Sequence, residues 1–380
     1  METAEKTLLL TGFPSSFVAR KLLPRLLSRG PADRVKCLVP EGSLDKAAEH
    51  LRELDKERSG RIEIVKGDTA AMDFGMAGPA FVELARSVNV VHHCAAAAHA
   101  GVSREVAERL NVGGAGEIVD LALASDGHVE RVVHWSSALL CGKRSGRVLE
   151  SELVEPPGSR GVVDETRFRA ELLMREAMSS LPITILRPSI VVGDSKTGEI
   201  DRMEGPYLLI LLMLSSPVDL RVPLPGRGDQ PLHLVPIDYV VDAGVAISRD
   251  PRSRGRTFHI VDEQPLTVRR VFELIAEAAG RPGPVGSLPT NLANALLRTP
   301  GLERLSQIPR TFLEQLATEV VYDSRNTREL LVGTGLQCPT AATYLKGMVD
   351  HVRGEQAKRG KARKAAKNPH FEEMEDPLDH

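Results

Sequence analysis

The stretch TLLLTGFPSSFVARKLLPRLL, residues 7–27, has the pattern of a buried strand, a tight turn and a helix. An apolar run of three leucines ends at Thr11-Gly12, and a segment of helical character follows. Strand, tight turn and helix in this order open the units that hold a pyrophosphate at a helix N-terminus. Such turns carry three glycines, and only Gly12 is present here. The stretch therefore predicts a dinucleotide-type turn with altered phosphate contacts.

Strand-like and helical segments alternate through the first half of the chain. Helical segments such as 43–56 and 80–86 separate the strand-like runs, a spacing typical of βαβ units. We predict an α/β fold, a Rossmann-type doubly wound parallel sheet with a smaller, discontinuous C-terminal substrate domain. The predicted strands are Thr7–Leu10, Val35–Val39, Ile62–Lys66, Val88–His92, Arg131–Trp135 and Ile183–Leu186.

Changes of composition predict the domain boundaries. Residues 1–195 and about 232–263 form the dinucleotide-binding domain. Residues from about 196–231 and 264–353, which Gly and Pro interrupt, form the substrate-type domain. Residues 354–380 carry a basic run and then an acidic run, a pattern typical of a solvated, disordered tail.

The bulk composition excludes several classes of protein. A net charge of −2 and a pI near 6.6 argue against nucleic-acid binding. The four cysteines are widely separated, so neither a disulfide framework nor a metal site is expected, which favours a cytoplasmic setting. No signal segment is expected from residues 1–6, and the longest apolar run, Tyr207–Leu214, is too short to span a bilayer. The oligomeric state is left open.

Eight short motifs follow one another along residues 7–352. They are TGFP (11–14), KGD (66–68), HCAAA (93–97), NVGGAGEIVDLA (111–122), HWSSALLCG (134–142), LRPSIVVGDSKTGEIDRMEGPY (186–207), VPIDYVVDA (235–243) and YDSRNTRELL (322–331). In this order and spacing they resemble the extended short-chain dehydrogenase/reductase family. Within it they are most similar to the branch of thioester reductases and fatty acyl reductases. In that branch an Asn at the position of Asn111 braces the active site.

The resemblance implies a cleft for NAD(P). The implied cofactor-binding residues are Gly12, Phe13, Ser15, Ser16, Glu41, Asp68, Ala95, Ala96, Arg167 and Pro188. Ser15 and Val18 stand where the family has its second and third glycines, so we expect weakened binding and a helix pushed outward by Val18. Family members that use NADPH often have an Arg where this chain has Pro40-Glu41. Glu41 would repel a 2′-phosphate and therefore favours NADH.

The resemblance also implies a catalytic centre of Ser or Thr, Tyr, and a Lys four residues after the Tyr. Ser137 matches the first position, Val163 stands at the Tyr position and Arg167 at the Lys position. Without any alignment, none of the four tyrosines in the chain is followed four residues later by Lys. Arg167 keeps the positive charge but does not readily release a proton. Loss of a general acid typically costs a factor of about 10²–10⁴ in rate.

Two functional interpretations follow. In the first, the chain is a degenerate reductase-like protein that binds a small-molecule or acyl-type ligand, or a protein partner, without catalysis. In the second, it is an active NAD(P)H-dependent oxidoreductase that reduces an acyl thioester, aldehyde or ketone. This second interpretation needs a non-standard proton donor, for which His99 and His134 are the candidates. A third, weaker idea is docking to a membrane or partner through the charged tail and Tyr207–Leu214.

Overall fold

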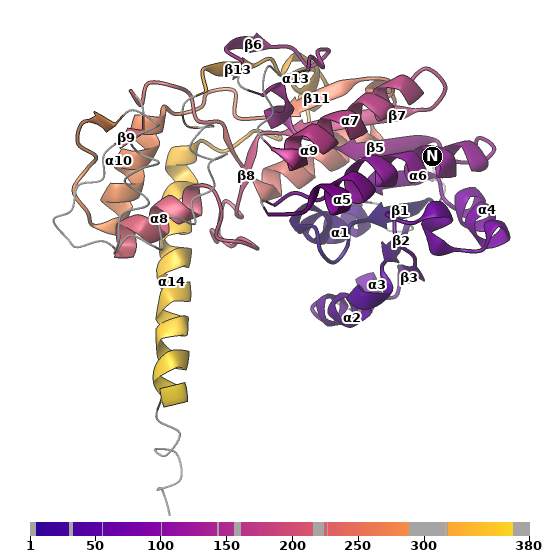
Figure 1. Ribbon diagram of the computed structural model, residues 1–380, viewed down its shortest axis with the longest axis horizontal. Helices are drawn as coiled ribbons and strands as arrows, with labels where there is room; N and C mark the ends of the chain where they lie inside the picture. Colours follow the sequence, from indigo (N-terminus) through magenta and orange to yellow (C-terminus); the bar gives the residue numbers. More distant parts are fainter. Residues whose placement is uncertain are drawn as a thin grey trace, which may run out of the picture.

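A seven-stranded parallel sheet forms the centre of the molecule (Figure 1). The computed structural model describes residues 5–29, 33–54, 56–99, 101–142, 144–155, 161–215, 224–225, 227–288, 316 and 318–367. In spatial order the strands are β3 (Ile62–Lys66), β2 (Arg34–Val39), β1 (Thr7–Thr11), β4 (Val90–His93), β5 (Arg131–Trp135), β7 (Ile183–Pro188) and β11 (Thr257–Ile260). The order reverses at β1, where β4 lies on the side opposite β2. The predicted Rossmann-type fold is confirmed.

Helices cover both faces of this sheet. One face carries α1 (Phe17–Arg29), α2 (Leu44–Arg52), α9 (Ile237–Arg249) and α13 (Arg325–Leu331). The other face carries α4 (Gly78–Ser87), α6 (Gly114–Ala124) and α7 (Val162–Ala177). Two single turns, α3 (Lys56–Ser59) and α5 (Arg104–Ala107), complete this part. Because both faces are covered, the central strands are nearly continuous apolar runs, as the sequence pattern suggested.

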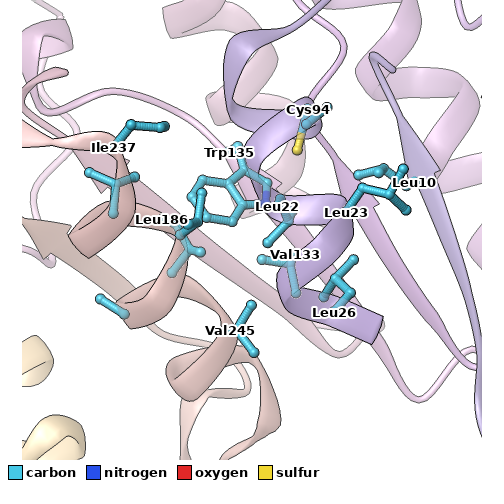
Figure 2. Close-up of a cluster of buried hydrophobic side chains, with 14 of the residues drawn as sticks. Leu10, Leu22, Leu23, Leu26, Cys94, Val133, Trp135, Leu186, Ile237 and Val245 are labelled. Carbon is cyan, nitrogen blue, oxygen red and sulfur yellow. The ribbon is translucent and has the colours of Figure 1, made fainter. Parts of the chain in front are cut away.

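Trp135, the single tryptophan, anchors the packing of α1 and α9 on the sheet. Figure 2 shows its ring beside Leu22 of α1 and Leu186 of β7. A Cβ at Gly244 of α9 would lie 2.2 Å from the indole ring. Glycine at this position therefore lets α9 approach the sheet closely enough to cover the strand ends that carry the site.

A second cluster of buried side chains lies outside the sheet. It joins α8 (Pro206–Ser215), α10 (Val268–Ala279) and the first half of α14 (Ala341–Lys367). Three two-stranded parallel sheets lie outside the central sheet: β8 (Ile190–Val192) with β10 (Leu234–Pro236), β9 (Leu224–Pro225) with β12 (Ser287–Leu288), and β6 (Gly146–Val148) with β13 (Val320–Tyr322). No helix within the described ranges is long and apolar enough to cross a membrane.

Two assignments from the sequence need correction. Residues 354–367 were expected in a disordered tail, but they continue α14, and Figure 1 shows this end projecting away from the body. Between Arg353 and Lys361 none of its side chains is buried. Residues 264–353 were expected to lie wholly in the second domain. Instead Leu330 and Leu331 of α13 pack into the core of the first.

Candidate functional site

The turn after β1 lies where the strand order reverses, the place at which open α/β sheets bind ligands. Gly12 has φ +85°, and a Cβ there would lie 2.7 Å from the carbonyl carbon and oxygen of Cys94. Only glycine allows the turn to lie this close to the end of β4. The Phe13 ring is buried and packs on His50, so only its backbone can meet a ligand. Ser15 is exposed at the tip of the turn.

At the start of α1, the residues that form the turn and pack on the sheet are not those at the family's second and third glycine positions. The backbone N–H of Ser16 donates to the Gly12 carbonyl (2.7 Å), and its hydroxyl accepts from the N–H of Ala19 (3.4 Å). Ala19 is fully buried in the helix–sheet contact, whereas Val18 is only partly buried. The expectation that Val18 pushes the helix outward is therefore wrong, because the smaller Ala19 occupies the position of closest packing.

Arg20 holds this turn in place, a role that the sequence analysis did not predict. Its Nη1 donates to the Pro14 carbonyl (2.6 Å) and its Nη2 pairs with the Asp201 carboxylate (2.6 Å). One residue later, Lys21 pairs with Glu199 (3.1 Å). The turn is thus attached to the segment that follows β8. An Arg in the first turn of an amphipathic helix reads as a solvated residue, so the pattern alone gives no signal for this role.

The ends of β2 and β3 carry opposite charges. Glu41, just after β2, accepts a 2.8 Å bond from Nζ of Lys66 at the end of β3, and both side chains are exposed. This hydrogen bond and the Lys66 charge lower the pKa of Glu41. Asp68 follows β3 and accepts from the Ala70 N–H through Oδ1 (2.9 Å), which leaves Oδ2 for a ligand.

Asn111 links the end of β4 to α7. Its side chain lies in a π-helical segment, Glu108–Gly113, where it accepts from the Ala97 N–H (2.8 Å) and donates to the Thr166 hydroxyl (2.8 Å). Ala95 and Ala96, just before, are partly exposed at the strand end. π-Helical turns are frequent at functional sites. Asn111 therefore joins the segment after β4 to α7, and its role at the active site stays a prediction.

Ser137 follows the end of β5, and Arg167, in the first half of α7, contacts its neighbour Ser136. The Ser137 hydroxyl accepts from the Leu139 N–H (3.2 Å) at the start of a 3₁₀ turn. Nη2 of Arg167 donates to the Ser136 carbonyl (3.0 Å). Val163 lies one turn earlier on α7 and provides no donor or acceptor from its side chain. Burial lowers the pKa of the Arg167 guanidinium, although Asp164 and Glu171 oppose this.

The histidine candidate His134 does not have the properties of a neutral-pH acid at this site. His134 is buried in β5 and stacks on His93, with 5.5 Å between ring centroids. Burial lowers the pKa of His134 to about 4 and that of His93 to about 3, so both are neutral at pH 7. His99 is exposed. Among the described residues, no group of three or more His, Cys, Asp or Glu side chains is placed to hold a metal ion.

Glu171 forms a buried network that the sequence analysis missed. It accepts from the Ser136 hydroxyl (2.5 Å), from Arg175 (2.9 Å) and from both Nε and Nη2 of Arg187. The neighbouring arginines and the serine hydroxyl hold the pKa of Glu171 at about 2 despite its burial. Pro188 follows Arg187 and ends β7 in the core. The available signal was a Glu four residues after Arg167 and four before Arg175, on one helix face.

The comparison with known families agrees with this geometry. The family model described as "Male sterility protein", an NAD-binding domain, matches residues 10–244. The chain belongs to this family. Its resemblance to the thioester reductase and fatty acyl reductase branch is thereby confirmed, and the chain is an NAD(P)-binding domain of the reductase type.

Individual relatives fit the same family. Glycine betaine reductase ATRR of Emericella nidulans is 29% identical over 71% of this chain and 22% of that protein. Fatty acyl-CoA reductase wat of Drosophila melanogaster is 26% identical over 59% of this chain and 49% of that protein. The crystal structure of the terminal R domain from the myxalamid PKS-NRPS pathway is 25% identical, with TM-score 0.78 over 94% of this chain and 93% of that one. The chain spans less than half the length of both curated relatives.

Proposed function

We propose that this member of the male sterility protein family binds a dinucleotide and a small or acyl-type ligand without reducing it. The cleft fits a dinucleotide because α1 begins at the switch point and Gly12 lets the turn lie against β4. NAD(P) bound there would bring hydride chemistry to the ends of β4, β5 and β7. The side chains at those ends bind and orient, but none of them supplies a proton.

One observation carries the proposal. Val163 and Arg167 stand at successive turns of α7, and Arg167 is tethered to the Ser136 carbonyl. A guanidinium remains protonated at neutral pH and so does not act as an acid. The buried His134, with its pKa lowered to about 4, is also without a proton to give at pH 7. The remaining groups can polarise a carbonyl but not protonate the product oxygen.

A small hollow lies beside the 3₁₀ turn that follows Ser137. Arg144, Glu152 and Arg187 form its polar side. Its apolar lining consists of Leu140, Cys141, Val148, Leu153 and Val154. Its volume of about 10 Å³ is room for about one water molecule, so the acyl-type ligand is proposed for the cleft at the strand ends and not for this hollow.

Titration tests the proposal directly. Purified protein is titrated with NADH and NADPH, followed by nicotinamide fluorescence and by heat of binding. We expect micromolar binding, with NADH preferred because Glu41 repels a 2′-phosphate, and no turnover of acyl thioesters, aldehydes or ketones. Turnover would establish the alternative, an active oxidoreductase, and absence of binding up to millimolar nucleotide would refute the dinucleotide part.

The double variant Val163→Tyr/Arg167→Lys separates the two parts of the proposal. Restoring the acid should create reductase activity where the parent has none, because a positioned acid contributes a factor of about 10²–10⁴. The single variant Val163→Tyr is the matched control, since it lacks the Lys that lowers the Tyr pKa. Equal activity in the parent and the double variant would show that the missing Tyr and Lys are not the cause of the missing reductase activity.

The alternative of an active enzyme has one specific observation in its favour. Ser137 keeps a hydroxyl proton to donate to a carbonyl oxygen, since its oxygen already accepts from Leu139. Asn111 holds β4 and α7 in register. Under this alternative a solvent molecule must deliver the proton, and reduction should quicken as the pH falls. A pH-independent rate in the parent would argue against this route.

A further inference from the structure

Arg167 differs from the other arginines of α7. Arg169 pairs with Glu108 (2.5 Å) and Arg175 pairs with Glu171 (2.9 Å). Arg167 donates to a backbone carbonyl, and within the described parts of the chain no ion pair with a carboxylate is formed by it. The side chain is mostly buried. Asp164 and Glu171 act on the pKa of Arg167 without forming an ion pair with it. The mostly buried guanidinium thus lacks a direct anionic contact, and an anion in the cleft would provide one.

The groups beside Arg167 are hydrogen-bond donors. The Ser137 oxygen already accepts from the Leu139 N–H, so its O–H proton is available. The Asn111 side chain is used between Ala97 and Thr166. The family's acid position, which would have added a phenol, is Val163. Ser137 and Arg167 therefore offer donors and Val163 an apolar side chain, while the carboxylates of Asp164 and Glu171 act on Arg167 from its own helix.

A set of donors fits a ligand group that only accepts. The carboxylate is planar, carries two acceptor oxygens and matches the fork of a guanidinium through two parallel bonds. An aldehyde offers one weak acceptor and a carboxamide brings N–H groups that would meet other donors. We propose that the cleft beside Ser137 and Arg167 binds the carboxylate of a small aliphatic acid. This rests on the proposed function, because it assigns the ligand of the same non-reducing site.

Arg167 has donors for both a cofactor and an acid. A guanidinium has five N–H groups, and one of them is used on the Ser136 carbonyl. The remaining donors can meet a ribose hydroxyl, as the resemblance to the family implies for this position, and a carboxylate oxygen. The carboxylate site therefore does not require the dinucleotide to leave, and the two ligands can be measured separately.

The probe is hexanoate, compared with hexanamide and hexanal, by calorimetry with and without saturating NADH. We expect hexanoate to bind at least tenfold more tightly than hexanamide, and Arg167→Gln to remove that preference. Arg169→Gln, on the exposed side of the same helix, is the matched control and should leave hexanoate binding unchanged. Arg167→Lys should retain part of the preference, because it keeps the charge but loses the fork.

Two results would overturn the carboxylate site. One is equal affinity for hexanoate and hexanamide, and the other is unchanged hexanoate binding in a folded Arg167→Gln protein. NADH affinity, measured on the same samples, keeps the two proposals apart. NADH binding without a hexanoate preference would overturn only the carboxylate site. A hexanoate preference without NADH binding would support that site and overturn the dinucleotide part of the proposed function.

Discussion

Two charged side chains on neighbouring turns of α7, Glu171 and Arg167, have very different partners. Glu171 is fully buried, and Ser136, Arg175 and Arg187 all donate to it. Arg167, one turn earlier, donates to the Ser136 carbonyl, and within the described ranges no carboxylate forms an ion pair with it, although Asp164 and Glu171 act on its pKa. A buried charge that is fully compensated stabilises one arrangement of the chain, whereas an incompletely compensated charge favours a ligand. The comparison therefore separates a part of the site that holds the fold from a part that faces a ligand.

The buried histidines should make the folded protein less stable in acid. Burial lowers the pKa of His92, His93 and His259 to about 3 and that of His134 to about 4, and it also lowers the pKa of His233. These histidines are neutral in the folded protein. In the unfolded chain their pKa is the ordinary 6.5, so they take up protons below that pH. Stability should be constant above that pH and should fall from pH 6.5 towards 4.

The five histidines together should lower the free energy of unfolding by up to about 10 kcal/mol between pH 7 and 5, since each contributes up to about 2 kcal/mol at pH 5. Glu150 and Asp262, whose pKa values burial raises, act in the opposite direction and reduce the total. Urea unfolding midpoints at pH 7.5, 6.5, 5.5 and 5.0 measure it. His99→Gln, an exposed control, should leave the curve unchanged. Midpoints that stay constant down to pH 5 would contradict the prediction.

Glu171→Ala tests the compensated turn directly. Removing this carboxylate leaves Arg187 buried without its ion-pair partner, and we expect the free energy of unfolding to fall by about 3–5 kcal/mol. Chemical denaturation measures the change. Glu176→Ala, at an exposed position of the same helix, is the control and should change stability by less than about 0.5 kcal/mol. A loss below about 1 kcal/mol for Glu171→Ala would show that the network is not holding the helix.

The sequence predicted the sheet more completely than the site, for a physical reason. Strands buried on both faces read as apolar runs, so the runs from Thr7 and Arg131 matched β1 and β5 closely. Glu171 was missed because a charged residue in a helix normally indicates solvent. Its burial depends on Arg187 from a strand and Ser136 from a loop. Three segments must be placed in space before their charges can be seen to compensate one another.

The phosphate turn shows a second limit of sequence spacing. Counting from Gly12 placed the closest helix–strand contact at Val18, but Ala19 occupies it. The N–H of Ser16 reaches back to the Gly12 carbonyl, so the chain turns once more before the helix begins at Phe17. Local sequence does not reveal the length of such a turn, whereas a single residue changes which side chain meets the sheet.

The substitutions Ala19→Val and Val18→Ala sharpen this boundary. Overpacking the fully buried Ala19 should lower the free energy of unfolding by about 1–3 kcal/mol and weaken NADH binding, because α1 moves away from the sheet. Val18→Ala removes a partly buried side chain and should cost less than about 1.5 kcal/mol. Urea denaturation and NADH titration measure both effects. A larger loss of unfolding free energy for Val18→Ala than for Ala19→Val would show that Val18, and not Ala19, makes the closest contact with the sheet.

The smallest expected effect lies at the exposed rim of the cleft. Glu41→Gln removes the carboxylate that would repel a 2′-phosphate and leaves Lys66 without its partner, so NADPH affinity should rise. Because both side chains are exposed and screened, the change should be only about twofold to fivefold and should shrink at high salt. Glu63→Gln, which breaks the ion pair between the exposed Glu63 of β3 and the half-buried Lys36 of β2, is the control. NADPH affinity that rises equally in both variants would mean a general charge effect. A rise in NADPH affinity in Glu41→Gln alone would show that Glu41 at the rim determines the cofactor preference, independently of the buried charges around Glu171.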